Sequence, residues 1–126
     1  MIGKNNPLNI RYNPLNRWKG QTGQTKGFCD FSSLEFGVRA ALYLVKVSYA
    51  KKGCKTYQEI IRRFAPPVEN NSDSYVHFVC DKLSVLPFDV PYYPLDWVYL
   101  IHAMSIFEGN EIKKVTINNV YNKYFL

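Results

Sequence analysis

The sequence predicts a mainly α domain of four to five helices, preceded by a long N-terminal loop region. Two observations predict this fold class. The first 31 residues are interrupted by Pro and Gly without helical periodicity, and the rest repeats apolar residues at helical spacing behind capping motifs. With 126 residues, 47% of them hydrophobic, the chain fits a single domain over residues 1–126.

The N-terminal region, residues 1–31, is expected to form loops with two short strands, at Asn9–Tyr12 and Gly27–Phe31. Long loops in small domains tend to carry binding or catalytic residues, because they lie at the surface of a rigid scaffold. We therefore expect functional residues in this region.

A long helix is predicted to begin at Ser32, which has capping-box spacing to Glu35. Apolar residues then recur at helical spacing from Leu34 to Tyr49. Gly53 directly follows two lysines, and we expect it to end this helix.

The later helices are predicted from capping residues and from helix-stopping residues. Thr56 and Glu59 repeat the capping-box spacing, and Pro66 stops the helix that they begin. Residues 70–73 are expected to cap a third helix, and Thr116 a short final one. The helices after the second are expected at residues 73–83, 95–107 and 116–125.

The net charge of +6 is unevenly distributed. Residues 1–63 hold twelve Lys and Arg against three acids, whereas residues 64–126 hold four against seven. A basic half suits a polyanionic partner, and equally a solvated surface that aids solubility. No recognition-helix or RNA-binding motif is present and no apolar run approaches transmembrane length, so neither a nucleic-acid partner nor membrane insertion is expected.

The three cysteines, Cys29, Cys54 and Cys80, form no CxxC pair, and His77 and His102 lie at no ligand spacing from paired cysteines. No metal site and no cofactor are therefore expected. Widely spaced cysteines in odd number favour folding in a reducing cytoplasm.

Glycoside cleavage is the chemistry that the acidic residues suit best. It requires a carboxylic acid beside the leaving oxygen, and a second carboxylate or a substrate-assisted route for the cationic sugar. Glu108 ends an apolar helix, where the helix dipole disfavours a carboxylate, and a residue that breaks a local rule often has a function. Glu35 lies among apolar and aromatic residues beside the N-terminal loop. The alternatives are an exposed last-turn residue for Glu108 and a helix cap for Glu35.

Two further residues have open roles. Glu69, in the loop before the third helix, is suited either to contact a substrate or to help cap that helix. Tyr75 is suited either to stack on a substrate or to fill the core, and the 16% of aromatic residues gives the chain many such faces.

Several strings along the chain resemble a family of phage and prophage lysozyme-like proteins, often described as virion structural proteins. The N-terminal ones are Asn5-Asn6-Pro7-Leu8-Asn9-Ile10-Arg11-Tyr12, Trp18-Lys19-Gly20-Gln21 and Gly27-Phe28-Cys29-Asp30-Phe31. Matches continue at residues 35–41 and 64–70 and at Glu108-Gly109, so that the resemblance covers residues 5–110. The chain is also distantly similar to the autolysin and flagellar glucosaminidases, whose Asn-x-x-Gly-Ile-Lys element is echoed at residues 6–11.

The resemblance implies a lysozyme-like helical domain with a groove that binds peptidoglycan glycan strands. Two features depart from the pattern. Leu8 stands where the family has glycine, which makes a left-handed backbone there less comfortable. The glucosaminidases carry their catalytic glutamate on a helix before this element, whereas only four residues precede Asn5 here. Our hypothesis is a circular permutation that moved the acid to Glu108.

The sequence therefore predicts a peptidoglycan glycan-strand hydrolase of the muramidase or lytic transglycosylase type, with Glu108 first and Glu35 second as general acid. The alternative is a non-catalytic peptidoglycan-binding or virion structural module of the same fold, with virion components as partners. No signal peptide is recognisable, so we expect synthesis in the cytoplasm and then incorporation into a virion or release to the cell wall. The predicted substrate-binding residues are Asn9, Arg11, Tyr12, Trp18, Glu69, Asn70 and Tyr75.

Overall fold

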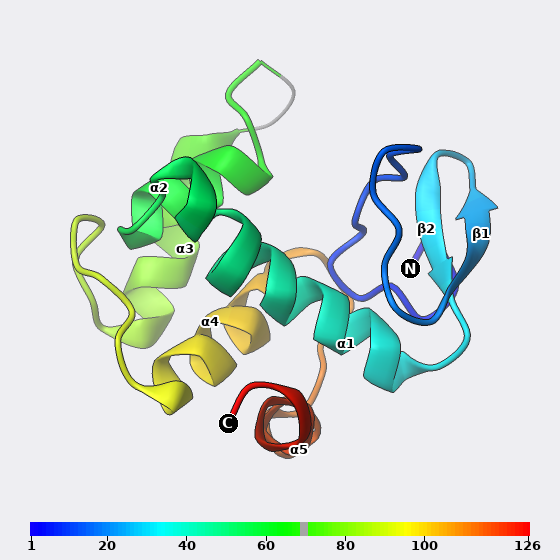
Figure 1. The fold of residues 1–126 in the computed structure, drawn as a ribbon. Coiled ribbons are helices and arrows are strands. Elements are labelled where there is room, and N and C mark those ends of the chain that lie inside the picture. The colour runs from blue at the N-terminus through cyan, green and yellow to red at the C-terminus, as the bar shows by residue number, and fades with distance from the viewer. Residues whose placement is uncertain (69–70) are drawn as a thin grey trace.

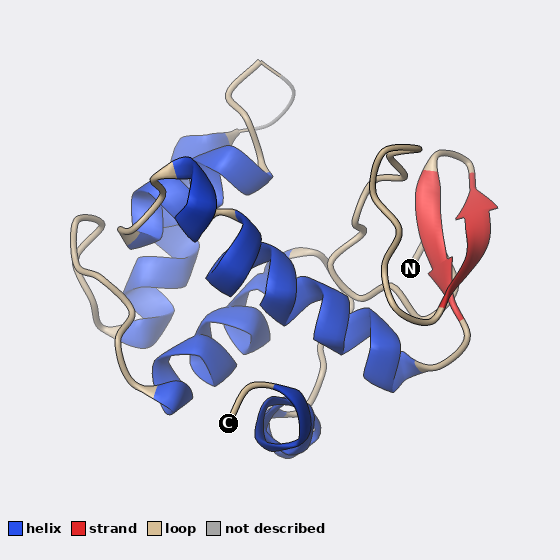
Figure 2. Cartoon of the chain, viewed as in Figure 1, coloured by secondary structure: helices blue, strands red, loops and turns tan. Residues whose placement is uncertain are grey.

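The computed structural model describes residues 1–68 and 71–126, in which a β-hairpin precedes five α-helices (Figures 1 and 2). The hairpin consists of β1 (Gln21–Thr25) and β2 (Phe28–Phe31). The predicted mainly α fold class, with its long N-terminal loop region, is confirmed. The α-helices are α1 (Leu34–Tyr43), α2 (Tyr57–Phe64), α3 (Ser72–Leu83), α4 (Pro94–Phe107) and α5 (Lys114–Tyr124).

The α4 helix is central to the packing, because it contacts α1, α3 and α5. The first part of α1 lies beside the hairpin and the N-terminal loop, whereas α2 and α3 lie toward its other end (Figure 1). Buried apolar side chains from all of these elements form one cluster, which extends from Leu8 in the N-terminal loop to Tyr121 in α5. Within the described residues, no helix combines the length and the apolar character needed to cross a membrane.

The N-terminus of α1 corrects one prediction. Ser33, not Ser32, is the N-cap, and its hydroxyl accepts a hydrogen bond from the Phe36 N–H at 3.4 Å. The Ser32 N–H donates to the Gly20 carbonyl oxygen at 2.9 Å, so it does not donate to the Glu35 side chain as a capping box requires. Glu35 is therefore not the partner of a capping box.

The predicted helix up to Gly53 is present only in part as an α-helix, because α1 ends at Tyr43, although Gly53 ends the helical turns that follow. Beyond α1 the chain forms a wide π-helical turn, η1 (Leu44–Ser48), and then a tight 3₁₀ turn, η2 (Ala50–Lys52). Single π-helical turns inside a helix often occur at functional sites. Here the turn carries Leu44 into the candidate site described below.

The ends of the later helices match the predictions except at α5. The capping box of Thr56 and Glu59 is present and begins α2. The α5 helix begins at Lys114, so that Thr116 lies inside it and does not cap it. The early start is explained by the residue before the N-cap, Ile112. Its carbonyl oxygen is hydrogen-bonded to the His102 ring, and its N–H donates to the Ser105 hydroxyl, both on α4.

The hairpin differs from the predicted pair of strands. The strand predicted at residues 27–31 is present as β2, but residues 9–12 form no strand and contribute only a bridge between Arg11 and Phe28. The partner of β2 is β1, because Lys26 and Gly27 both have positive φ, 52° and 86°. A two-residue turn of this kind joins adjacent antiparallel strands.

The N-terminal loop is attached to the rest of the molecule through Asn6, which is completely buried. Its amide Nδ2 donates to the Ile10 and Cys29 carbonyl oxygens, both at 3.0 Å, and its Oδ1 accepts from the Ile10 N–H at 2.9 Å. Against α1 the loop approaches so closely that a Cβ at Gly37 would lie 1.7 Å from the Asn5 carbonyl oxygen. Only glycine fits there.

The strain expected at Leu8 is not present. Leu8 is fully buried in the core and is not among the residues with positive φ. The left-handed conformations fall on Asn5 and Asn9, with φ of 56° and 52°. Asparagine tolerates this conformation better than leucine does.

All three cysteines are unpaired. Cys29 and Cys80 are buried, and desolvation raises the pKa of both thiols. A buried thiol at Cys80 agrees with its place in an apolar helical pattern.

We predict that Asn6→Ala lowers the free energy of unfolding by about 3 kcal/mol, because it leaves the Ile10 N–H and the Cys29 carbonyl without the partner that Asn6 supplies. Urea denaturation followed by circular dichroism measures the change. The control is Asn119→Ala, on the exposed face of α5, which should change stability by less than about 0.5 kcal/mol. Equal effects of the two substitutions would contradict the anchoring role of Asn6.

Candidate functional site

A groove of about 640 Å³ lies between the N-terminal loop and the helices. One wall is formed by residues 8–14 with Trp18, and the other by Leu44, Tyr49, Phe64 and Glu108. Its volume is in the range of small-ligand sites. The groove therefore joins the segment that the sequence predicted to be functional with one predicted acid.

Glu108 is the only acidic side chain that lines the groove in the described part of the chain. It follows the last residue of α4, and Gly109, with φ of 79°, ends the helix there. Its Oε1 accepts a hydrogen bond from the Asn9 amide at 3.1 Å. A carboxyl group held in this way can bind sugar hydroxyls or deliver a proton.

Two buried tyrosines support this corner of the groove. Tyr75 is 2% exposed, stacks on Phe107 with ring centroids 3.9 Å apart, and places its hydroxyl beside the Glu108 carboxylate. Burial, and then the charge and hydrogen bond of Glu108, raise the pKa of Tyr75. Tyr49 lines the groove itself, and burial raises its pKa as well. Both phenols therefore stay neutral hydrogen-bonding groups.

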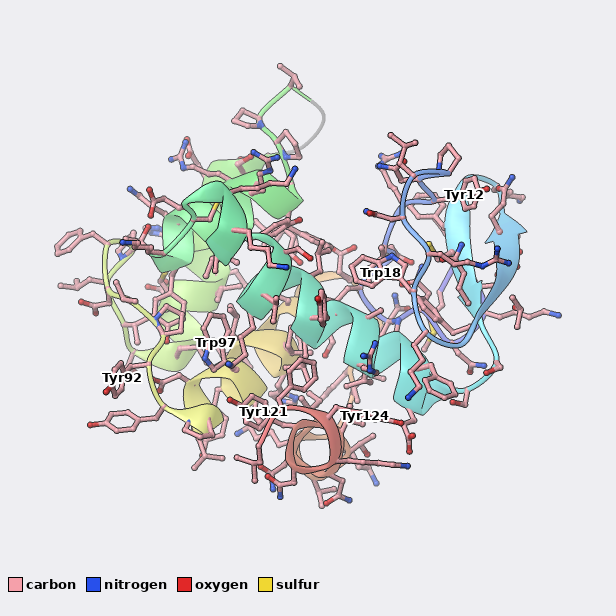
Figure 3. All side chains as sticks on the ribbon, viewed as in Figure 1. Tyr12, Trp18, Tyr92, Trp97, Tyr121 and Tyr124 are labelled. Carbon is pink, nitrogen blue, oxygen red and sulfur yellow. The ribbon has the colours of Figure 1, made fainter. Side chains whose placement is uncertain are left out.

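Besides Asn9, three predicted binding residues line the N-terminal wall. Tyr12 is exposed, and Trp18 is half-buried between the N-terminal loop and α1 (Figure 3). The Trp18 ring makes an edge contact with Tyr43 at 6.0 Å between centroids. Arg11 lies with its guanidinium 5.3 Å from the centre of the Phe28 ring. The wall thus presents aromatic faces and one cation to the groove.

The structure brings together some of the predicted site residues and separates others. Asn9, Arg11, Tyr12 and Trp18 share the groove with Glu108, and Tyr75 lies behind that carboxylate as a buried neighbour. Glu35 does not line the groove. Glu69 and Asn70 lie outside the residues that the structure describes.

Glu35 instead joins α1 to α5. Its Oε2 accepts hydrogen bonds from the Tyr124 hydroxyl and, at 3.0 Å, from Lys123. The Tyr124 hydrogen bond, followed by that of Lys123, lowers the pKa of Glu35. These contacts are those of a structural carboxylate.

Sequence reasoning did not identify Tyr49 and Phe64 as groove residues. Both occur at apolar positions of helical runs, which is the pattern of core residues, and only the packing of the N-terminal loop shows that they border a groove. For Asn13 and Asn16, which also line it, a clue was available in the polar composition of the loop. Among the described residues, no group of three His, Cys, Asp or Glu side chains could hold a metal ion.

The chain is similar to a known phage protein. No protein-family model matches the sequence. The chain is 31% identical over 88 residues to Protein P5 of Pseudoalteromonas phage PM2, an alignment that covers 67% of this chain and 55% of the relative. The chain thus matches little more than half of the relative's length. The similarity supports the phage part of the predicted resemblance, whereas its lysozyme-like part stays a prediction.

The ion pair of Glu35 gives a pH-dependent prediction. Since its folded-state pKa is lowered, its contribution to stability is present above the unfolded pKa and is lost as the pH falls through the folded pKa. We expect Glu35→Gln to lose less stability than the wild type between about pH 5 and pH 3. Urea midpoints across this range measure the difference.

The matched control for this experiment is Asp81→Asn, at an exposed position of α3. Its urea midpoints should follow those of the wild type over the whole range. Superimposable curves for Glu35→Gln and the wild type would refute the role of Glu35 as a carboxylate that links α1 to α5.

Proposed function

We propose that the groove binds peptidoglycan glycan strands and that Glu108 acts there as the general acid of glycan cleavage. The observation that carries this proposal is the Glu108 carboxyl in the groove lining, hydrogen-bonded to Asn9 of the N-terminal loop. The aromatic faces of Tyr12 and Trp18 suit the flat, apolar faces of sugar rings. Arg11 suits a carboxylate of the muramyl lactyl group or of the attached peptide.

The proposed cleavage of the glycosidic bond uses one acid, Glu108. Glu108 donates its proton to the glycosidic oxygen, the bond from that oxygen to the sugar carbon breaks, and the Asn9 amide stabilises the resulting carboxylate. No second carboxylate lines the groove in the described residues. The sugar cation is then captured by water or by a hydroxyl of the substrate, which gives its proton to Glu108. This route favours lytic transglycosylase chemistry.

The second candidate is a non-catalytic module that binds peptidoglycan or forms part of a virion. Two observations favour it. The relative is a phage protein, and a groove with one carboxylate in its described lining suffices for binding. Most glycosidases use two carboxylates.

The test compares Glu108→Gln with the wild type on purified peptidoglycan, by zymogram and by mass analysis of the released fragments. We expect fragment release to fall at least about 100-fold, because proton donation is lost, while binding to insoluble peptidoglycan persists. Glu35→Gln is the matched control, and its release should equal that of the wild type.

The outcomes separate the two candidates. Full release by Glu108→Gln would contradict the acid role of this residue. A wild type that binds peptidoglycan but releases no fragment would favour the non-catalytic module. A wild type that does not bind would contradict both the cleavage and the peptidoglycan-binding role, and would leave only the virion role of the second candidate.

A further inference from the structure

A second pocket, of about 670 Å³, adjoins the groove. Trp18 and Asn16 line both, so that the Trp18 ring forms a shared wall (Figure 3). The rest of the second pocket is formed by the chain before β1 and by α1 and η1. A ligand in the groove therefore has a side pocket within reach of its branches.

The lining of this pocket is cationic. Arg17, Lys19 and Arg39 all contribute to it, and no acid lines it in the described residues. Glu35 is close enough to Lys19 for the two charges to interact, but its carboxylate is already bonded to Lys123. The pocket thus has an excess of positive charge and an electrostatic preference for an anion.

Arg39 is the residue most clearly arranged for a ligand. Its guanidinium lies over two rings, 5.7 Å from the centre of Tyr43 and 5.2 Å from that of Tyr124. Its Nε is buried and has no hydrogen-bond partner in the described part of the chain, which is rare in proteins. Because the Arg39 side chain as a whole is only partly buried, an anion in the pocket binds the remaining N–H groups of the same guanidinium.

We propose that this cationic pocket (Arg17, Lys19 and Arg39) binds carboxylates of the peptides that branch from glycan strands. The proposal rests on the proposed function of the groove. A glycan strand has an uncharged backbone and carries anionic peptides as branches, which matches a groove with little charge beside a cationic pocket. A nucleic-acid backbone would instead need cations along the whole path, because every residue of it carries a phosphate.

The test measures binding by calorimetry in the Glu108→Gln protein, which excludes cleavage. The two ligands are a disaccharide-pentapeptide fragment of peptidoglycan and the same fragment with its carboxyl groups amidated. We expect the carboxylate form to bind about tenfold more tightly, the size of one or two charge-assisted hydrogen bonds. Adding Arg17→Gln and Arg39→Gln should remove this preference and leave the affinity for the amidated form unchanged.

Two further variants guard against a folding artefact. Arg17→Gln alone changes an exposed side chain and should remove part of the preference, and Lys52→Gln, an exposed change in η2, should remove none. Thermal unfolding verifies that every variant is folded.

Equal affinity of the two ligands, or equal loss of both in the arginine variants, would overturn the proposal. Tighter binding of a DNA duplex that depends on the same arginines would overturn it in favour of a phosphate ligand. Because the readout is binding, a protein that cleaves no glycan can still satisfy this test. The failure of the proposed cleavage is thus distinguishable from the failure of the cationic pocket.

Discussion

The buried amide of Asn6 is the interaction on which the candidate site depends. Backbone hydrogen bonds from Cys29 and Phe31 of β2 reach Ile10 and Lys4 of the N-terminal loop, and the buried Asn6 side chain adds its own bonds to Ile10 and Cys29. This fixes the turn in which Asn9 takes its left-handed conformation and reaches Glu108 at the other end of the chain. The buried Asn6 side chain thus fixes the conformation of the loop that forms one wall of the groove.

The parts of the fold that could be predicted are those that local chemistry determines. The capping box of Thr56 and Glu59 is complete within four residues, so sequence spacing alone identifies it. At Ser32 and Ser33 two adjacent residues suit the same role, and only the structure identifies Ser33 as the cap. The start of α5 is likewise fixed by contacts with α4, which no local pattern encodes.

The N-terminal wall of the candidate site was predicted from the loop and its motifs, and the acid from a conflict with local helix stability. Glu108 was identified because a carboxylate at a helix C-terminus opposes the helix dipole, and the structure gives it a hydrogen-bond donor from another segment. Glu35 had the same residue type but a favourable local environment, and the structure gives it structural partners. Tyr49 conflicts with no rule, since a buried aromatic residue on a helix is ordinary. Its place in the groove follows from tertiary packing alone.

Trp18 lines both the groove and the cationic pocket, two neighbouring pockets of different charge that can bind parts of one ligand. On one side of its ring lies Glu108 with a single cation, Arg11, and on the other lies a group of cations without an acid in the described lining. The Trp18 ring belongs to both linings, so that a ligand in the groove lies next to the cationic pocket. A ligand with a neutral backbone and anionic branches can occupy both sides, whereas a uniformly charged polymer would meet Glu108 in the groove. The arrangement of charge around one tryptophan therefore favours a branched glycan over a simple polyanion.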